Sequence, residues 1–103
     1  MARKSRFYNV FVRNGYGEQQ HVVPAQTEAH AREYFSSSTE NAYKAQHLGF
    51  FDVTLQGDPS SGIHFWATIE GYDYRYEQGD AGFGYLEFLF KKPFDNMLDE
   101  MLG

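Results

Sequence analysis

The sequence predicts an α+β fold in which a mainly antiparallel sheet of about five strands has a helix packed on one face. Three observations support this prediction: short apolar runs of alternating polarity, turn-forming residues between them, and two stretches of helical periodicity. The expected order is ββα(α)βββ, followed by a short C-terminal amphipathic helix. A chain of 103 residues suffices for one hydrophobic core, so a single domain covering residues 1–103 is expected.

Two strands are expected at the start of the chain. Residues 7–13 are rich in aromatic and β-branched side chains, which favour a strand. The Asn-Gly-Tyr-Gly segment that follows is typical of a turn, and residues 19–23 return as a second strand that Pro24 ends. Residues 1–6 are short, basic and terminal, and we expect them to be mobile.

Helical signals occupy residues 27–48. Thr27 can cap a helix N-terminus, and Glu28 places a carboxylate in the first turn, where it suits the helix dipole. Ser37 and Glu40 have the spacing of a capping box, which indicates a second helix start. One kinked helix and two short helices both fit this pattern, and the choice between them stays open.

The alternation of apolar and polar side chains shifts by one position within the next predicted strands. Residues 50–55 and 63–70 have the alternation of strands three and four, and a loop rich in glycine and serine separates them. Their continuation, residues 71–77, reads GYDYRYE and alternates tyrosines with charges. The apolar side chains stand at odd positions up to Ile69, whereas the tyrosines stand at even positions from Tyr72 onward. An uninterrupted strand would therefore place the tyrosines on the opposite face.

A one-residue bulge at Gly71 would restore the phase, because glycine inside a strand pattern is a common bulge site. The tyrosines then face inward as sheet packing. The outer face exposes three side chains suited to contact with a partner: His64, Trp66 and Arg75.

The end of the chain predicts one more strand and a helix. Residues 85–91 (YLEFLFK) alternate in polarity and are expected to form the fifth strand, which Pro93 ends. Residues 94–103 form an amphipathic tail, marginal alone and in need of a surface to fold against. Its apolar side chains recur at helical spacing: Phe94, Met97, Leu98, Met101 and Leu102.

Composition narrows the class of function. The formal net charge of −5 opposes binding to phosphate backbones, so nucleic acid is an unlikely general partner. The chain has no cysteine, which excludes disulfides and thiolate chemistry and fits a cytoplasmic protein. No apolar run approaches the length of a membrane span, so a membrane is not expected as a partner.

Catalytic patterns are missing from the sequence. The four histidines show no metal-binding spacing, and no nucleophile elbow is present. The glycine-rich residues 79–84 lack the lysine of a phosphate-binding loop. We therefore expect no enzyme, and name no catalytic, cofactor or metal residue. A general base at His64 is the enzymatic alternative.

The first functional hypothesis is a small protein-interaction module. Aromatic residues make up 18% of the chain, and tyrosine, tryptophan and phenylalanine often anchor interfaces. The candidate contact surfaces are the outer sheet side chains and the tail. Residues 94–102 resemble the short hydrophobic-acidic C-terminal peptides by which some phage replication and transcription proteins engage a sliding clamp. A phage-encoded modulator or inhibitor of a host complex would suit this profile, and an exposed edge strand would allow a homodimer.

Two alternatives remain open. The first is single-stranded nucleic-acid binding through Trp66, Arg75 and the basic N-terminus, since stacking sheets use aromatics beside basic side chains. The second is an acidic DNA mimic, because carboxylates are concentrated in the last third of the chain.

Overall fold

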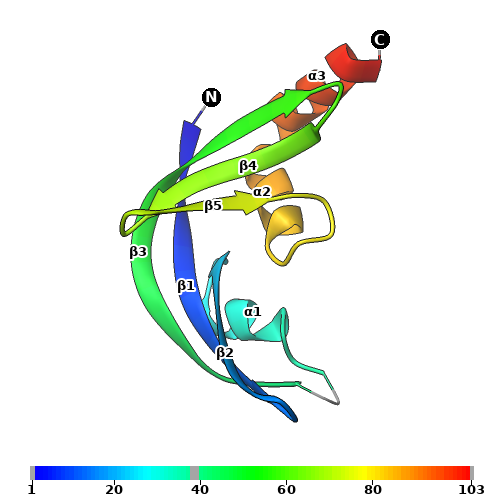
Figure 1. Ribbon diagram of the computed structural model, residues 1–103. Coiled ribbons are helices and arrows are strands. Elements are labelled where there is room, and N and C mark those ends of the chain that lie inside the picture. Colours follow the sequence, from blue (N-terminus) through cyan, green and yellow to red (C-terminus); the bar gives the residue numbers. More distant parts are fainter. Residues whose placement is uncertain (1, 38–39, 103) are drawn as a thin grey trace. The chain divides into compact units, whose positions relative to one another are not determined.

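The computed structural model describes residues 2–37 and 40–102. Within them the chain forms five strands and three helices, and the strands make one antiparallel sheet in the order β2-β1-β3-β4-β5 (Figure 1). The predicted α+β fold, its strand number and its order ββαβββ are confirmed. The elements are β1 (Ala2–Asn14), β2 (Gly17–Pro24), α1 (Glu28–Glu33), β3 (Glu40–Asp58), β4 (Gly62–Ile69), β5 (Tyr72–Tyr76), α2 (Phe83–Leu89) and α3 (Lys91–Leu102).

Residue contacts divide the chain into two compact units. The 5–50 unit contains most of β1, all of β2 and α1, and the first half of β3. The 51–103 unit also includes residues 1–4, and it contains the rest of β3 with β4, β5, α2 and α3. Each unit buries its own apolar side chains. The single domain expected from chain length stays a prediction.

The basic N-terminal residues belong to β1, which begins at Ala2. The Arg3 guanidinium donates from Nη1 to the Leu89 carbonyl (2.5 Å), and its Cζ lies 5.5 Å from the centre of the Phe90 ring. The ammonium of Lys4 lies 3.7 Å from an Asp52 carboxylate oxygen. Mobility of this segment stays a prediction, but both charges have partners within the 51–103 unit.

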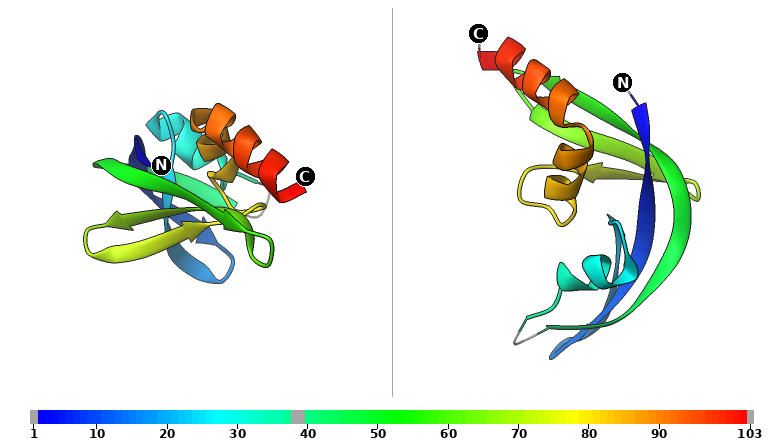
Figure 2. Two further views of the ribbon diagram at one scale, coloured as in Figure 1. Left: turned by 90° about the horizontal axis from the view of Figure 1, so that it is seen from above. Right: turned by 180° about the vertical axis from the view of Figure 1, so that it is seen from behind.

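The first helix starts where the sequence predicts. The Thr27 hydroxyl oxygen accepts a hydrogen bond from the His30 backbone N–H (3.1 Å), and Glu28 occupies the first turn. Ala31 is fully buried. In both views of Figure 2, α1 lies beside the part of the sheet that β1 and β2 form. The buried apolar side chains of this unit are Phe7, Tyr8, Val10, Val12, Val23, Pro24, Ala25, Ala31, Ala42 and Ala45.

Removing the cap should destabilise this helix measurably. Thr27→Ala is expected to lower the free energy of unfolding by about 1 kcal/mol, because the His30 N–H loses its acceptor. Thr27→Ser keeps a hydroxyl at the same position and should stay close to the wild type. Urea denaturation followed by circular dichroism measures both changes, and an equal loss in the two variants would contradict the capping role.

The second helical segment predicted over residues 37–48 is wrong, because β3 begins at Glu40. The Ser37 hydroxyl accepts from the Glu40 N–H (3.2 Å) and the Ser37 N–H donates to the Glu40 carbonyl (3.2 Å), so this pair closes a turn into a strand. Residues 38–39 lie outside the described part. Ala42 and Ala45 are both buried, whereas the two side chains between them are exposed. The spacing of Ser37 and Glu40 that indicated a helix start is therefore used by hydrogen bonds at the start of β3, which explains the wrong prediction.

The change of phase before the tyrosines comes from a two-residue hairpin turn. β4 pairs with β5 antiparallel, with Ile69 opposite Tyr72 and Phe65 opposite Tyr76. The turn residues Glu70 and Gly71 have φ of 53° and 88°, the positive values that a tight type I′ hairpin requires. The predicted bulge is therefore wrong. The predicted faces are correct, because a two-residue turn changes the side-chain parity just as one extra residue would.

The tyrosines differ in burial along β5. Tyr76 is buried, Tyr74 is half-buried, and Tyr72 is 71% exposed. The ring of Tyr76 stands opposite Phe65, at the centre of this unit's core, and Tyr72 stands beside the turn. Only Tyr76, the tyrosine of β5 nearest the helices, therefore packs fully inward.

Burial raises the pKa of the Tyr76 phenol well above its usual range, and the nearby Tyr74 and Asp80 raise it further. Above pH of about 10 the unfolded chain ionises this phenol while the folded chain keeps it protonated, so the unfolded state gains stability. We expect the free energy of unfolding to fall more steeply with pH there in the wild type than in Tyr76→Phe. Urea midpoints measured across this pH range test the difference. Tyr16→Phe, which changes an exposed ring, should keep the wild-type dependence.

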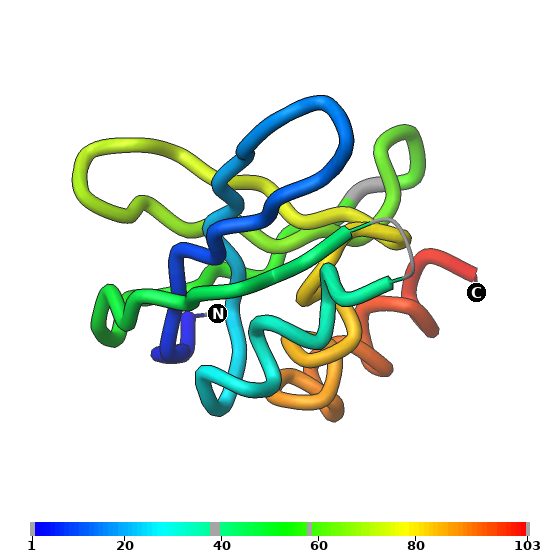
Figure 3. Tube along the Cα trace, turned by 90° about the horizontal axis from the view of Figure 1, so that it is seen from below, coloured from blue at the N-terminus to red at the C-terminus, as the bar shows by residue number. Residues whose placement is uncertain are grey.

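The strand predicted over residues 85–91 is wrong, because residues 85–89 lie in α2 and α3 begins at Lys91. The chain leaves β5, turns at Gly82 (φ 92°) and continues into α2 and α3 (Figure 3). Phe83, Leu86 and Phe90 are buried at i, i+3 and i+7, which is helical spacing. The aromatic content of this segment favours a strand locally, but packing on Phe65 decides its structure. The hairpin of β4 and β5 supplies the fourth and fifth strands instead.

One ring stands at the centre of the 51–103 core. The Phe65 ring on β4 lies 5.3 Å from the Phe83 ring, 5.3 Å from Phe90 and 6.2 Å from Phe94, measured between centroids. α2 and α3 are thus joined to the sheet through a single aromatic cluster. The other buried apolar side chains of the unit are Val53, Leu55, Ala67, Ile69, Tyr76 and Leu86.

Candidate functional site

The structure brings together the three outer sheet residues named from the sequence. Trp66 stands directly opposite Arg75 in the β4–β5 register. The Arg75 Cζ lies 5.9 Å from the centre of the Trp66 ring, and its Nη2 lies 3.4 Å from His64 Nδ1. The imidazole and indole rings meet edge to face, with centroids 6.2 Å apart. These contacts make one cluster on the face opposite the aromatic core.

Within this cluster, His64 is less accessible than the sequence suggests. The residue is only 5% exposed, so its expected exposure to solvent is wrong, although its face is correct. Trp66 is half-buried, and Arg75 pairs with Glu77 at 2.8 Å. The accessible part of the cluster is therefore the Trp66 edge with a guanidinium that already has a carboxylate partner.

The tail forms the predicted amphipathic helix, α3. Phe94 is buried in the unit's own core, and Met97 lies over β3, where a Cβ built on Gly57 would be 2.8 Å from Met97 Sδ. In the last two turns, by contrast, Leu98 is 39% exposed and Leu102 is 79% exposed. The first turns of α3 are thus anchored to the protein itself, and the last turns present leucines to solvent.

Acidic side chains surround these leucines. Asp95, Asp99 and Glu100 on α3 are all exposed. The 51–103 unit, with residues 1–4, contains ten Asp and Glu against five Lys and Arg, whereas residues 5–50 contain four of each kind. The net charge of −5 therefore belongs to the unit that carries α3, because the acidic and basic residues of the 5–50 unit are equal in number.

A second surface escaped the sequence interpretation. We call it the aromatic–basic face of the 5–50 unit, and its members come from β1 and β3. Three of its cations lie over rings at 4.7–5.0 Å from the ring centres. The two arginines at positions 6 and 13, with Phe7, Tyr8 and Phe11 between them, were the available signal. The face consists of Arg6, Phe11, Arg13, Tyr43, Lys44, His47 and Phe50, and the buried Tyr8 ring lies beneath it against His47.

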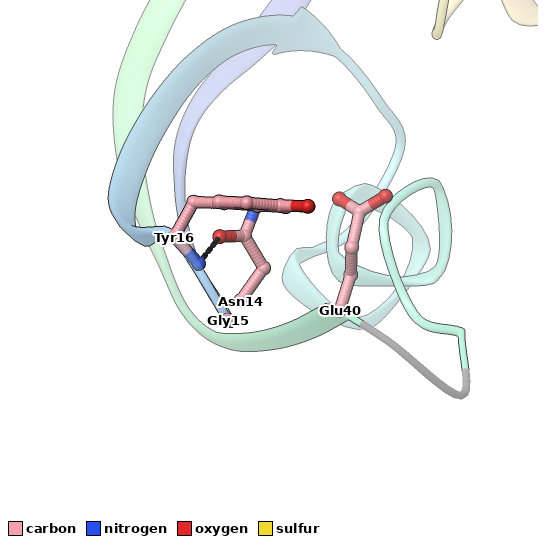
Figure 4. Close-up of a pocket in the computed structure, with 4 residues that line it drawn as sticks. All are labelled: Asn14, Gly15, Tyr16 and Glu40. Atoms are coloured by element: carbon pink, nitrogen blue, oxygen red, sulfur yellow. Dashed lines mark hydrogen bonds between the residues drawn. The ribbon is translucent and has the colours of Figure 1, made fainter.

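An open hollow lies at the tip of the β1–β2 hairpin. It is lined by Asn14, Gly15, Tyr16 and Glu40, and the Tyr16 side chain extends across it towards Glu40 (Figure 4). The hydrogen bond drawn there, from the Tyr16 N–H to Asn14 Oδ1, belongs to the turn itself. One carboxylate and one phenol supply little chemistry, so this hollow adds no candidate reaction.

Within residues 2–37 and 40–102, no three or more His, Cys, Asp or Glu side chains are grouped so as to hold a metal ion. No helix of this part of the chain is long and apolar enough to cross a membrane.

Comparison with known proteins gives no relative. No protein-family model, curated protein sequence or solved structure matches this chain. A function must therefore be inferred from the side chains and their surroundings.

Proposed function

We propose that the protein is a non-enzymatic interaction module that binds another protein through the exposed leucine edge of α3. One observation supports this proposal above the others: α3 is held to its own unit by Phe94, yet it leaves Leu98 and Leu102 open to solvent. Two leucines spaced i, i+4 form a stripe on one side of a helix. Such a stripe is the usual anchor of a helix that docks into a groove.

The anchoring of α3 reduces the cost of binding. A free peptide of this length would have to fold as it binds, which removes affinity. Here the Phe94 ring is stacked with the Phe65 ring, and its centroid lies 6.0 Å from that of Phe83. These contacts hold the helix in its folded form before a partner binds. Preorganisation of this kind increases affinity without adding contacts.

The charge around the stripe describes the partner. Exposed carboxylates at Asp95, Asp99 and Glu100 favour a groove with an apolar floor and a basic rim. Complementary charge of this sort speeds association and excludes acidic competitors. The Trp66–Arg75 cluster supplies a second contact region on the same unit, since tryptophan and arginine are frequent interface anchors.

In the cell, this binding would modulate or inhibit a complex to which the partner belongs. A phage-encoded inhibitor acting in the host cytoplasm is the form of this proposal that suits a small, acidic, cysteine-free chain. Sedimentation of the purified protein tests the alternative of a homodimer. The edge strands of the sheet, β2 and β5, would allow two copies to pair.

Affinity capture with matched variants tests the proposal. Tagged wild type and Leu98→Lys/Leu102→Lys are compared as bait in a lysate of the source cells. The wild type should retain a partner that the double variant loses, because two ammonium groups would enter an apolar groove with a basic rim. Tyr16→Lys, which changes a fully exposed ring in the other unit, should retain the partner. Equal capture by wild type and double variant would contradict the assignment.

A truncation is less suitable than these substitutions. Cutting the chain after Pro93 would also remove Phe94, and the Phe65 and Phe83 rings would lose a neighbour. Loss of the partner would then reflect damage to the core as well as loss of the contact surface.

A further inference from the structure

We infer that the aromatic–basic face of the 5–50 unit is a binding site for single-stranded nucleic acid. This site lies in a different unit from α3, so the inference goes beyond the protein-binding role proposed above. It also differs from the Trp66–Arg75 site considered from the sequence, where Glu77 already neutralises the guanidinium.

The rings and cations of this face are interleaved along β1 and β3. The Arg6 Cζ lies 4.9 Å from the centre of the Phe50 ring, and the Arg13 Cζ lies 4.7 Å from that of Tyr43. The Lys44 ammonium lies 5.0 Å from the centre of the Phe11 ring. Three ring–cation pairs therefore occur on neighbouring strands of one sheet.

Further ring contacts join these pairs into two clusters. His47 lies between the Tyr8 ring (5.3 Å) and the Phe50 ring (6.0 Å), and Phe11 lies 6.4 Å from Tyr43. Phe50 is 55% exposed and Tyr43 is 37% exposed, so part of each side chain meets solvent. On β1, Val10 and Val12 alternate with Phe11 and are fully buried, and Tyr8 shares their parity and their burial. The accessible rings of this surface are therefore those of Phe50 and Tyr43.

The cations of the face remain available to an anion. Among the described residues, neither Arg6 nor Lys44 has a carboxylate partner. Arg6 Nη1 donates to the Gln26 carbonyl (2.9 Å) and its Nε is buried, so only its remaining guanidinium N–H groups can serve an anion. Arg13 lies 3.4 Å from Glu18, but both side chains are exposed, and exposed ion pairs are weak. Phosphate oxygens can therefore pair with Lys44 and Arg13 without breaking a strong interaction.

The main objection to a nucleic-acid ligand is the negative net charge of the protein, and the distribution of that charge between the two units removes it. The protein is acidic as a whole, but residues 5–50 are formally neutral, with four Lys and Arg and four Asp and Glu. On the face itself three cations stand against the single carboxylate of Glu18. The charges on the face itself dominate the electrostatic attraction of a phosphate, because salt screens charges that lie more than about 10 Å away.

A single strand fits this face better than a duplex or a protein does. Base stacking on aromatic rings needs bases whose faces are free, and a duplex keeps its bases stacked inside. Aromatic rings and arginine are also common in protein interfaces, but a protein offers no regularly repeating anion for the cations that lie against three of these rings. A strand that offers a base and a phosphate in every nucleotide satisfies both kinds of group.

Fluorescence anisotropy with labelled oligothymidylate of roughly 16 nucleotides tests the inference. At low salt the wild type should bind, and the slope of log affinity against log salt should be roughly −2 for three phosphate contacts. Phe50→Leu and Tyr43→Leu keep apolar bulk but remove the ring, and each should weaken binding roughly tenfold or more. Lys44→Gln should reduce the slope by about 0.7.

Matched controls separate this site from the rest of the molecule. Tyr72→Leu removes an exposed ring from the other unit, and Leu98→Ala/Leu102→Ala removes the proposed protein contact. Both should bind the oligonucleotide as the wild type does, so failure of one proposal leaves the other standing. Circular dichroism confirms that each variant is folded.

Four results would overturn the inference. They are absence of binding at low salt, unchanged affinity in both Phe50→Leu and Tyr43→Leu, equal affinity for a duplex of the same length, and capture through this face of a protein that Phe50→Leu no longer retains.

Discussion

Replacing Phe65 with alanine should lower the free energy of unfolding by about 3–5 kcal/mol, the largest stability loss expected from a single substitution in this chain. The ring is fully buried and contacts Phe83, Phe90 and Phe94. Its removal leaves a cavity between β4 and both C-terminal helices, and the surrounding rings can close it only in part. Urea denaturation followed by circular dichroism measures the change.

Phe50→Ala is the matched control for this substitution. It removes the same side chain from a position that is 55% exposed, so it should cost about 1 kcal/mol or less. Similar losses in the two variants would contradict the central position of Phe65. Phe65→Leu, which keeps most of the apolar volume, should lie between Phe65→Ala and the wild type.

The second large effect concerns binding. Leu98→Ala/Leu102→Ala should lower the affinity for the captured partner roughly a hundredfold, since buried hot-spot side chains contribute about 2 kcal/mol or more each. Stability should change by less than about 1 kcal/mol, because both side chains are exposed in the free protein. Isothermal titration calorimetry with the purified partner measures the affinity.

Asp99→Asn provides a contrast with the leucine variant. Removing one exposed carboxylate should mainly slow association and weaken its dependence on salt, with a small effect on dissociation. If Asp99→Asn abolished binding while the leucine variant bound normally, the contact would be electrostatic, and the leucine stripe would have no role.

Local patterns predicted much of the fold. The β1–β2 hairpin, the Thr27 cap and the amphipathic α3 each depend on neighbouring residues, and each is confirmed. The inward tyrosine face was also predicted correctly, although the bulge assigned to Gly71 is in fact half of a tight turn. Side-chain parity is the same for both structures, so alternation alone cannot distinguish them.

The errors occur where distant contacts decide the structure. The segment of α2 has strand-forming aromatics, but Phe83, Leu86 and Phe90 become buried only because β4 brings Phe65 to them. Before β3, the capping-box spacing of Ser37 and Glu40 indicates a helix, but the segment that follows pairs into the sheet. In both segments the local pattern favours one element, whereas contacts with residues remote in the chain select another.

The candidate sites were predicted to different extents. Trp66 and Arg75 were placed on one face correctly, because alternation determines faces. The burial of His64 was not predictable from alternation, since one of its contacts, Arg75, comes from β5 through the β4–β5 register. The aromatic–basic face required the pairing of β1 with β3, and no local pattern shows which strands become neighbours.

Amide hydrogen exchange of α3, free and in complex with the captured partner, tests the proposed protein-binding role most directly. In the last turns of α3, residues 98–102, every side chain but the half-buried Met101 is exposed in the free protein, and these amides should exchange readily there. In the complex, their exchange should slow more than that of any other segment. Unchanged exchange at residues 98–102, with the slowing confined to other elements, would contradict the proposal that the exposed leucines of α3 form the contact surface.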